Sequence, residues 1–140
     1  MNLKKMVEET FYSIISEYGL KVNSINENEV ELINPNFKIS INCNFGEIYV
    51  LIKKDNDINI KPLLWAYCLN KISFKDIPIP IYPKEMKIDS IVKYNLFTEC
   101  NYIRIFCKEL LLGDFSKKYI YTENSQSVLK EINTYYEKTI

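Results

Sequence analysis

The chain has 140 residues, with 18 basic and 18 acidic side chains, so its formal net charge is zero. A chain of this length can bury a core of its own, and we expect residues 1–140 to form a single globular domain. The balanced charge argues against a general nucleic-acid binder, because such proteins carry a basic excess that displaces counterions from phosphate.

The first residues predict an amphipathic helix. Apolar side chains recur at three- and four-residue spacing from Leu3 to Tyr18, which marks one buried stripe. Asn2 is suited to cap the start of this helix, and Gly19 is suited to end it in a left-handed conformation. Glutamates interrupt the stretch and no window reaches the roughly 18 apolar residues of a membrane span, so we expect a cytoplasmic protein without a signal peptide.

The next segment predicts a four-stranded antiparallel meander that ends near Asp55. Apolar side chains there recur at every second position, most regularly from Phe37 to Phe45. Asparagine-rich turns and Gly46 separate the strands, and links this short make neighbouring strands antiparallel. The expected strands are residues 20–25, 29–33, 37–45 and 47–54.

Helices are predicted for most of the remaining chain. Pro62 can start a short helix that runs to about residue 72. A helical pattern spans residues 84–111, as one helix or as two with a break near residues 98–101, and a last helix spans residues 124–138. Between them, Pro78, Pro80 and Pro83 favour an extended segment. One helix, four strands and then helices packing on the sheet are typical of an α+β fold.

The stretch ELLLGDFSKKYIY, residues 109–121, has two interpretations. Gly113 follows the last apolar pair of a predicted helix, where a left-handed cap is expected. Asp114 can then accept backbone hydrogen bonds in the turn, and Phe115 can cover the helix end. We favour this helix terminus over an active-site corner.

The sequence predicts no catalytic residue, no cofactor and no metal, and hence no enzyme. It contains no histidine, the most common general base and neutral metal ligand. Its four cysteines, at positions 43, 68, 100 and 107, form no CxxC pair, which favours reduced and buried thiols over a zinc site. Its three glycines lie at predicted turns and helix ends, so there is no glycine-rich phosphate loop.

Three segments carry a resemblance to a known family. They are SEYGL (residues 16–20), which closes the first helix, NPNFKISINCNFGEIYVLIKK (residues 34–54), which covers the strands, and LLGDFS (residues 111–116), which closes a late helix. In this layout the chain resembles the small bacterial immunity proteins of polymorphic-toxin and contact-dependent growth-inhibition systems.

This resemblance implies a cytoplasmic inhibitor that forms a heterodimer with one cognate toxin domain of the nuclease type. The inhibitor would cover the active site of the toxin or a neighbouring surface. We expect no nucleic acid, membrane or small-molecule substrate as a partner. Such interfaces combine aromatic anchors with a charged rim. The expected partner-binding residues are Glu27, Glu29, Glu31, Tyr49, Leu51, Asp55 and Asp57.

Other interpretations stay open. A secretion-type chaperone also places a helix before a short meander, and it would bind an effector segment as a homodimer. A small enzyme would need a polar pocket with perturbed carboxylates. The glutamates from 27 to 31 can also form a solvated strand face, the two aspartates can simply form a turn, and Tyr49 and Leu51 can lie buried under helices.

Overall fold

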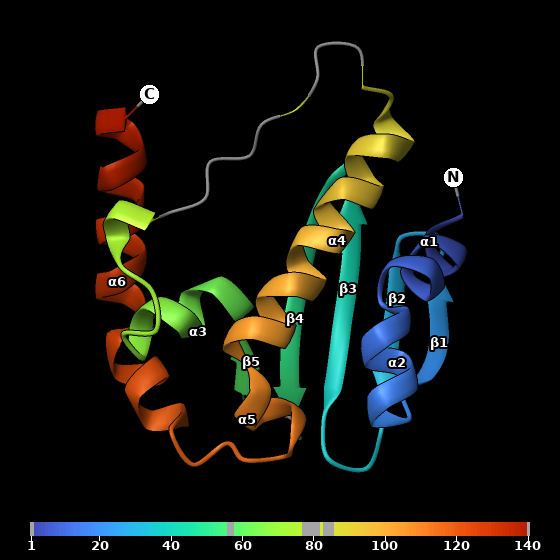
Figure 1. Cartoon of the computed structure of the whole chain (residues 1–140), viewed down its shortest axis with the longest axis horizontal. Helices are drawn as coiled ribbons and strands as arrows, with labels where there is room; N and C mark the ends of the chain where they lie inside the picture. The colour runs from blue at the N-terminus through green and yellow to red at the C-terminus, as the bar shows by residue number, and fades with distance from the viewer. Residues whose placement is uncertain (1, 56–57, 77–81, 83–85, 140) are drawn as a thin grey trace.

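The fold is α+β, as the sequence predicts. A computed structural model describes residues 2–55, 58–76, 82 and 86–139. Within these residues, helices lie before and after an antiparallel sheet of five strands in the order β1-β2-β3-β4-β5 (Figure 1). The helices are α1 (Leu3–Thr10), α2 (Tyr12–Tyr18), α3 (Pro62–Cys68), α4 (Ile88–Phe106), α5 (Lys108–Leu111) and α6 (Lys118–Thr139), and Phe74–Asp76 form a 3₁₀ turn. The strands are β1 (Lys21–Asn26), β2 (Glu29–Ile33), β3 (Lys38–Asn44), β4 (Glu47–Lys54) and β5 (Ile58–Ile60).

The N-terminal segment forms two helices rather than the single predicted one. Asn2 caps α1 as expected, because its side-chain oxygen accepts the Lys5 N–H at 3.1 Å. The helical path bends at the fully buried Phe11. The Thr10 hydroxyl donates to the Met6 carbonyl at 2.8 Å, a side-chain contact that often bends helices. Gly19 ends α2 with a left-handed φ of +60°, as predicted.

One face of the sheet supplies most of the core. The registers place Leu32, Ile39, Ile52 and Ile60 side by side across four strands, and each is fully buried. Helices α1, α2 and α4 lie on this face (Figure 1). All four cysteines are buried and unpaired, as expected for reduced core thiols. The period-two pattern of the sequence therefore marks the buried side of the sheet.

The sequence analysis predicted that the sheet ends near Asp55, but the structure adds a fifth strand after this residue. The chain turns there, with a φ of +55° at Asp55, and returns as β5 against Ile52–Lys54 of β4. With only three residues, β5 is too short to show a period in the sequence. Its Ile60 is fully buried, and this burial fixes the strand in place.

The β3–β4 hairpin differs from the prediction at Phe45. Phe45 was expected on the apolar side of its strand, but its side chain is 96% exposed. Phe45 and Gly46 form a two-residue turn with φ values of +51° and +84°, the backbone that tight hairpins require. The strand pattern therefore ends one residue earlier than its alternation indicates, and an aromatic ring stands at the hairpin tip.

Several helix boundaries differ from those predicted. The short helix α3 ends at Cys68 rather than near residue 72. Helix α4 continues through residues 98–101 and breaks at Cys107, where the buried thiol lies 3.8 Å from the Pro62 carbonyl. Helix α6 begins six residues earlier than expected, because Tyr121 in its first turn packs against Trp65, with ring centroids 6.0 Å apart. The predicted extended segment with Pro78, Pro80 and Pro83 lies outside the described residues.

Gly113 is a helix terminus, as predicted. Its φ is +83°, and the Asp114 N–H donates to the Glu109 carbonyl at 2.8 Å. Phe115 is buried beside this turn, and the Asp114 carboxylate accepts the Ser116 N–H at 3.0 Å. None of the helices in the described ranges combines the length and apolar character needed to cross a bilayer.

Gly19 provides a test of the helix ending. A Cβ at this position would meet no atom within 4 Å, so a substitution changes only the backbone preference. We expect Gly19→Ala to lower the free energy of unfolding by about 1 kcal/mol, the cost of a left-handed conformation for an ordinary residue. Urea denaturation measures this loss. Ser16→Ala, an exposed substitution within α2, is the control, and equal stability of the two variants would contradict the assignment.

Candidate protein-binding surface

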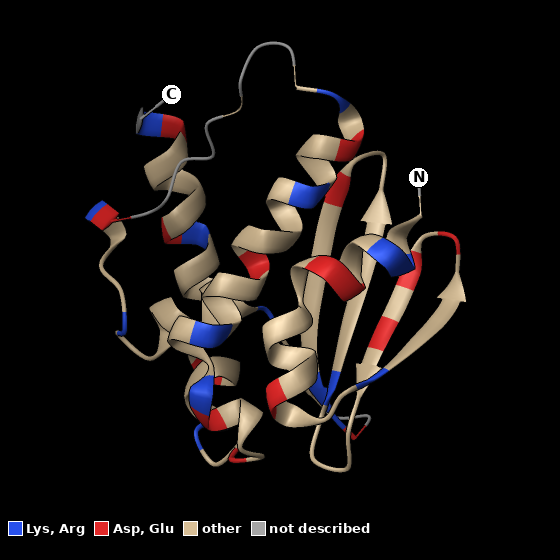
Figure 2. Ribbon diagram, turned by 45° about the vertical axis from the view of Figure 1, so that its right-hand side comes forward, with Lys and Arg blue, Asp and Glu red and all other residues tan. Residues whose placement is uncertain are grey.

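The face of the sheet opposite the helices forms a polar surface, which we call the open face. Its central rows are Glu29, Asn42 and Tyr49, followed by Glu31, Ser40 and Leu51, each row crossing β2, β3 and β4. No described helix covers this face in Figures 1 and 2. The residues between these positions on β2 and β3 belong to the core, and on the open face Ser40 is itself buried between Glu31 and Leu51.

Charge is distributed unevenly along the open face. The β2 glutamates mark one part of it, and lysines gather where the strands end near α5 (Figure 2). The Lys38 ammonium pairs with the Glu31 carboxylate at 2.8 Å, so this carboxylate is already partly neutralised. Glu29 makes no such pair with a described residue. The negative end of the face is therefore at Glu29 and the neighbouring Glu27, although the whole chain is neutral.

Tyr49 is the aromatic side chain of the open face. Half of its surface is exposed, and its hydroxyl donates to the Glu47 carboxylate. This hydrogen bond raises the pKa of Tyr49, because the neutral hydroxyl is the donor. The Tyr49 ring is fixed by its strand backbone and by this hydrogen bond. Its side chain therefore loses little conformational entropy when a partner covers it.

The structure brings together five of the seven residues predicted to bind a partner. Glu29, Glu31, Tyr49 and Leu51 lie in adjacent rows of the open face, and Glu27 lies in the turn that joins β1 to β2. Asp55 lies apart from them, in the turn between β4 and β5. Asp57 lies outside the described residues. Covering helices do not bury Tyr49, and Leu51 is only partly buried.

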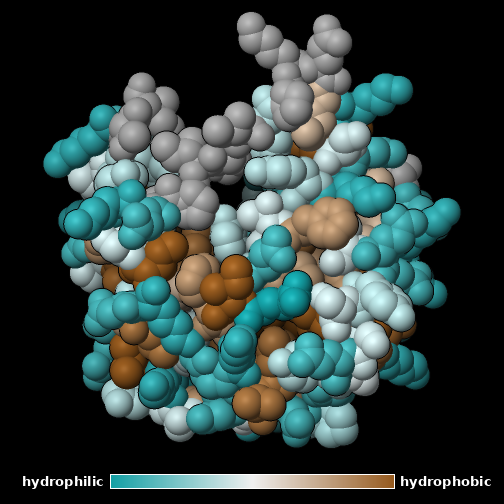
Figure 3. Space-filling view, in the orientation of Figure 1, coloured by the Kyte–Doolittle hydropathy of each residue, from teal (hydrophilic) through white to brown (hydrophobic). Residues whose placement is uncertain are grey.

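A cleft lies beside the open face, between β4 and helices α3, α4 and α6. It consists of two adjoining cavities of about 340 and 320 Å³ that share several lining residues. Their common lining is Ile48, Tyr49, Leu63, Glu99 and Tyr136. In the view of Figure 3, hydrophobic side chains reach the surface around the junction of α3, α4 and α6. Most of the cleft wall is therefore apolar or aromatic.

Glu99 of α4 is a residue of this cleft that the sequence interpretation missed. It forms no hydrogen bond or ion pair with any residue that the structure describes. Burial raises its pKa to about 7, because the charged form is deprived of water. The signal was present in the sequence, since Glu99 follows Leu96 by three residues and precedes Ile103 by four, and both are fully buried. An acidic residue on the buried side of a helix indicates a pocket or a polar partner at that position.

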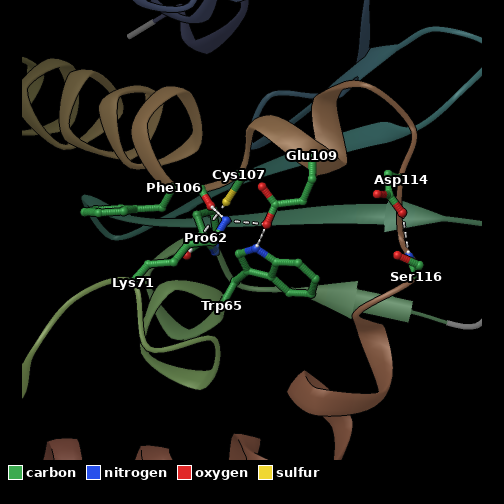
Figure 4. Close-up of polar contacts among 8 residues, drawn as sticks. All are labelled: Pro62, Trp65, Lys71, Phe106, Cys107, Glu109, Asp114 and Ser116. Atoms are coloured by element: carbon green, nitrogen blue, oxygen red, sulfur yellow. Dashed lines mark hydrogen bonds and ion pairs between the residues drawn. The ribbon is translucent and has the colours of Figure 1, made fainter.

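A polar contact joins α3 to α5 (Figure 4). The Trp65 indole N–H donates to the Glu109 carboxylate at 2.8 Å, and the Lys71 ammonium pairs with the same oxygen. Lys71 also donates to the Phe106 carbonyl at 2.7 Å. Burial alone would raise the pKa of Glu109, but the hydrogen bonds from Lys71 and Trp65 outweigh it and lower the pKa. We call Trp65, Lys71 and Glu109 the polar clamp.

The residues described around the Gly113–Asp114 turn form structural contacts rather than a catalytic group. It borders a shallow hollow of about 400 Å³, where the Lys54 ammonium donates to the Gly113 carbonyl at 3.2 Å. The Lys54 ammonium also stands 5.2 Å from the centre of the Phe115 ring. Hydrogen bonds from Ser116 lower the pKa of Asp114. In the described part of the chain, no group of three or more Cys, Asp and Glu side chains could hold a metal ion.

The raised pKa of Glu99 makes stability depend on pH. The folded chain keeps this proton up to about pH 7, whereas an ordinary glutamate releases it near 4.5. Between these values the folded state binds more protons, so the free energy of unfolding falls as pH rises. We expect Glu99→Gln to be more stable than the wild type at pH 8 by about 3 kcal/mol, because the two pKa values differ by about 2.5 and each pKa unit corresponds to about 1.4 kcal/mol.

Urea denaturation at pH 5 and at pH 8 measures this difference. Glu131→Gln, which changes an exposed carboxylate of α6, is the control and should follow the wild type at both values. If the wild type and Glu99→Gln lose stability in parallel between the two pH values, Glu99 is not the group that titrates.

The polar clamp predicts a coupling between Lys71 and Glu109. Removing one partner leaves the other half-buried and unpaired, so we expect Glu109→Gln and Lys71→Met each to cost about 1 to 3 kcal/mol. The double variant should cost less than the sum of the two, because the contact can be lost only once. Denaturation of the four proteins gives the coupling energy, and strict additivity would show that the two side chains act separately.

No protein-family model matches the chain, and no curated protein or solved structure matches it either. Its function therefore has to be inferred from its own residues and geometry.

Proposed function

We propose that this chain is an immunity protein, which binds one cognate bacterial toxin domain in the cytoplasm and neutralises it. The open face is the surface that binds. The observation that carries the proposal is the convergence of Glu29, Glu31 and Tyr49 on one uncovered side of a rigid sheet. The strand rows hold these side chains at fixed spacing, so the surface needs little reordering when it binds.

The chemistry of the open face supports a toxin of the nuclease type. A nuclease presents a basic groove to the phosphates of its substrate. Carboxylates such as Glu27 and Glu29, spaced along a hairpin, offer negative charge to the same groove, and Asn42 adds an amide between Glu29 and Tyr49. Tyr49 supplies an aromatic anchor of the kind that carries much of the binding energy in protein interfaces. The inhibitor would then occupy the groove and exclude the nucleic acid.

Co-purification is the first test of this proposal. The chain is expressed with a tag, together with the C-terminal domain of the large protein encoded immediately upstream in its genome. We expect a one-to-one complex and rescue of growth when the toxin domain is produced. A homodimer of this chain that ignores the toxin domain would overturn the proposal in favour of the secretion-chaperone alternative.

Substitutions on the open face test where the toxin binds. We expect Tyr49→Ala to weaken the complex by about 30-fold or more, the effect of about 2 kcal/mol at an interface hot spot. We expect Glu29→Lys to slow association and to change its salt dependence, because it reverses a charge at the rim. Both effects are measured by surface plasmon resonance at two salt concentrations.

Matched controls are available on α6. Tyr119 is 60% exposed and lies on a different element, so Tyr119→Ala removes a comparable ring from elsewhere on the surface. Glu131→Lys reverses a charge on the same helix. If a complex forms but Tyr49→Ala and Glu29→Lys bind as tightly as these controls, the toxin contacts another surface.

A further inference from the structure

The edge of β4 is only partly paired. On one side β4 pairs with β3 from Glu47 to Lys53, which is all of β4 except its last residue. On the other side β5 pairs only with Ile52–Lys54. In the described residues, no strand pairs with residues 47–51 on that side. A row of backbone hydrogen-bonding groups is therefore left at this edge.

The register shows which backbone groups point outward. The Cys43 N–H donates to the Asn28 carbonyl at 2.8 Å, on the side of β3 that faces away from β4. Cys43 and its partner Ile48 are thus a non-hydrogen-bonded pair, and the backbone groups of Ile48 point away from β3. The backbone groups of Val50 and Ile52 also point away from β3, because they follow Ile48 at every second position. At Ile52 these groups face Ile60 of β5, its partner in the register.

Ile48 and Val50 therefore present two N–H and two C=O groups at the free edge. None of these four groups has a hydrogen-bond partner in the described part of the chain. They lie two residues apart along the strand, a spacing of about 6.6 to 6.8 Å. Another extended chain has matching groups at the same spacing.

This free edge borders the cleft described above. Residues 47–51 line the two cavities as a continuous run of five. Side chains of a strand alternate between its two faces, so five consecutive residues can line one hollow only when the strand meets it edge-on. Leu63 of α3 and Leu129, Ile132 and Tyr136 of α6 form the opposite wall. The hollow thus joins an unpaired strand edge to an apolar surface.

Glu99 adds a carboxyl group to this hollow. It lines both cavities from the α4 side, and it has no cationic or hydrogen-bonding partner among the described residues. A half-buried carboxylate without a partner is costly, and a cationic side chain brought beside it would restore the ionised form. The cleft therefore favours a ligand whose positive charge lies beside Glu99, on the α4 side of the sheet.

We propose that this cleft binds an extended peptide segment, which adds to the sheet as a strand along Ile48 and Val50 and places a lysine or arginine side chain beside Glu99. Backbone pairing supplies the register, and alternate side chains of the segment enter the apolar part of the cleft. This second binding surface adjoins the toxin contact proposed on the open face and shares Tyr49 and Leu51 with it. Its presence does not depend on whether a toxin is the partner there.

A peptide titration observed by NMR tests this proposal. The probes are capped heptapeptides Thr-Xaa-Thr-Lys-Thr-Xaa-Thr, in which Xaa is valine, leucine or phenylalanine. With ¹⁵N-labelled protein, we expect at least one peptide to shift the amide signals of Ile48 and Val50 and to slow the exchange of these amides with water. Absence of both effects for all three peptides up to millimolar concentration would overturn the proposal.

Modified peptides separate backbone pairing from simple contact. Methylation of alternate peptide nitrogens in either of the two frames removes donors from one edge of the peptide. We expect one methylated frame to abolish binding and the other to preserve it. Equal binding by both frames would exclude strand addition. Binding of N-acetyl-lysine methylamide alone, with the same shifts, would mean that the cleft is a site for small cations.

Protein variants test the role of Glu99. We expect Glu99→Gln to weaken binding of the lysine peptide by about tenfold, the loss of one charge-assisted contact. A peptide with norleucine in place of lysine should bind both proteins equally. Glu131→Gln is the control and should bind like the wild type. Unchanged affinity of Glu99→Gln for the lysine peptide would remove the cationic side chain from the proposal.

Discussion

The position of α3 depends on one carboxylate. Glu109 accepts the indole N–H of Trp65 and pairs with Lys71, so it joins the start of α5 to the middle of α3 and to the segment that follows α3. Helix α6 in turn packs mainly on α3, through Trp65 and Tyr121. The Tyr121 hydroxyl also accepts the Lys61 N–H at 3.2 Å, just before α3 begins. The far wall of the cleft is therefore held in place by contacts that lie outside the cleft.

The sheet separates two kinds of surface. On one side, β-branched and leucine side chains pack under α1, α2 and α4 and are buried. On the other side, the same strands carry glutamate, asparagine and tyrosine in fixed rows. The stability that comes from the buried face keeps the polar face rigid. Because β5 covers only one end of β4, the sheet also keeps an open edge between these two surfaces.

Much of this arrangement can be read from local patterns. The alternation in β2, β3 and β4 predicts their buried side and, except at the ends of β3, their extent, which also places Glu29, Glu31, Tyr49 and Leu51 together. Gly19 and Gly113 mark helix ends because their left-handed backbone suits glycine. The three-residue β5 and the early start of α6 are set by tertiary contacts, which leave no period in the sequence. The cleft could not be predicted, because it exists only where α3 and α6 stand beside β4, although Glu99 among buried positions hinted at it.

Trp65 is the only tryptophan of the chain, and it sits within the polar clamp. Its ring is fully buried, beside Tyr121 of α6, and the Lys71 ammonium stands 6.0 Å from its centre. The fluorescence of the protein therefore comes mainly from the junction of α3, α5 and α6. A change at this junction alters the emission without any label, so the protein contains its own optical reporter of whether the wall of the cleft is in place.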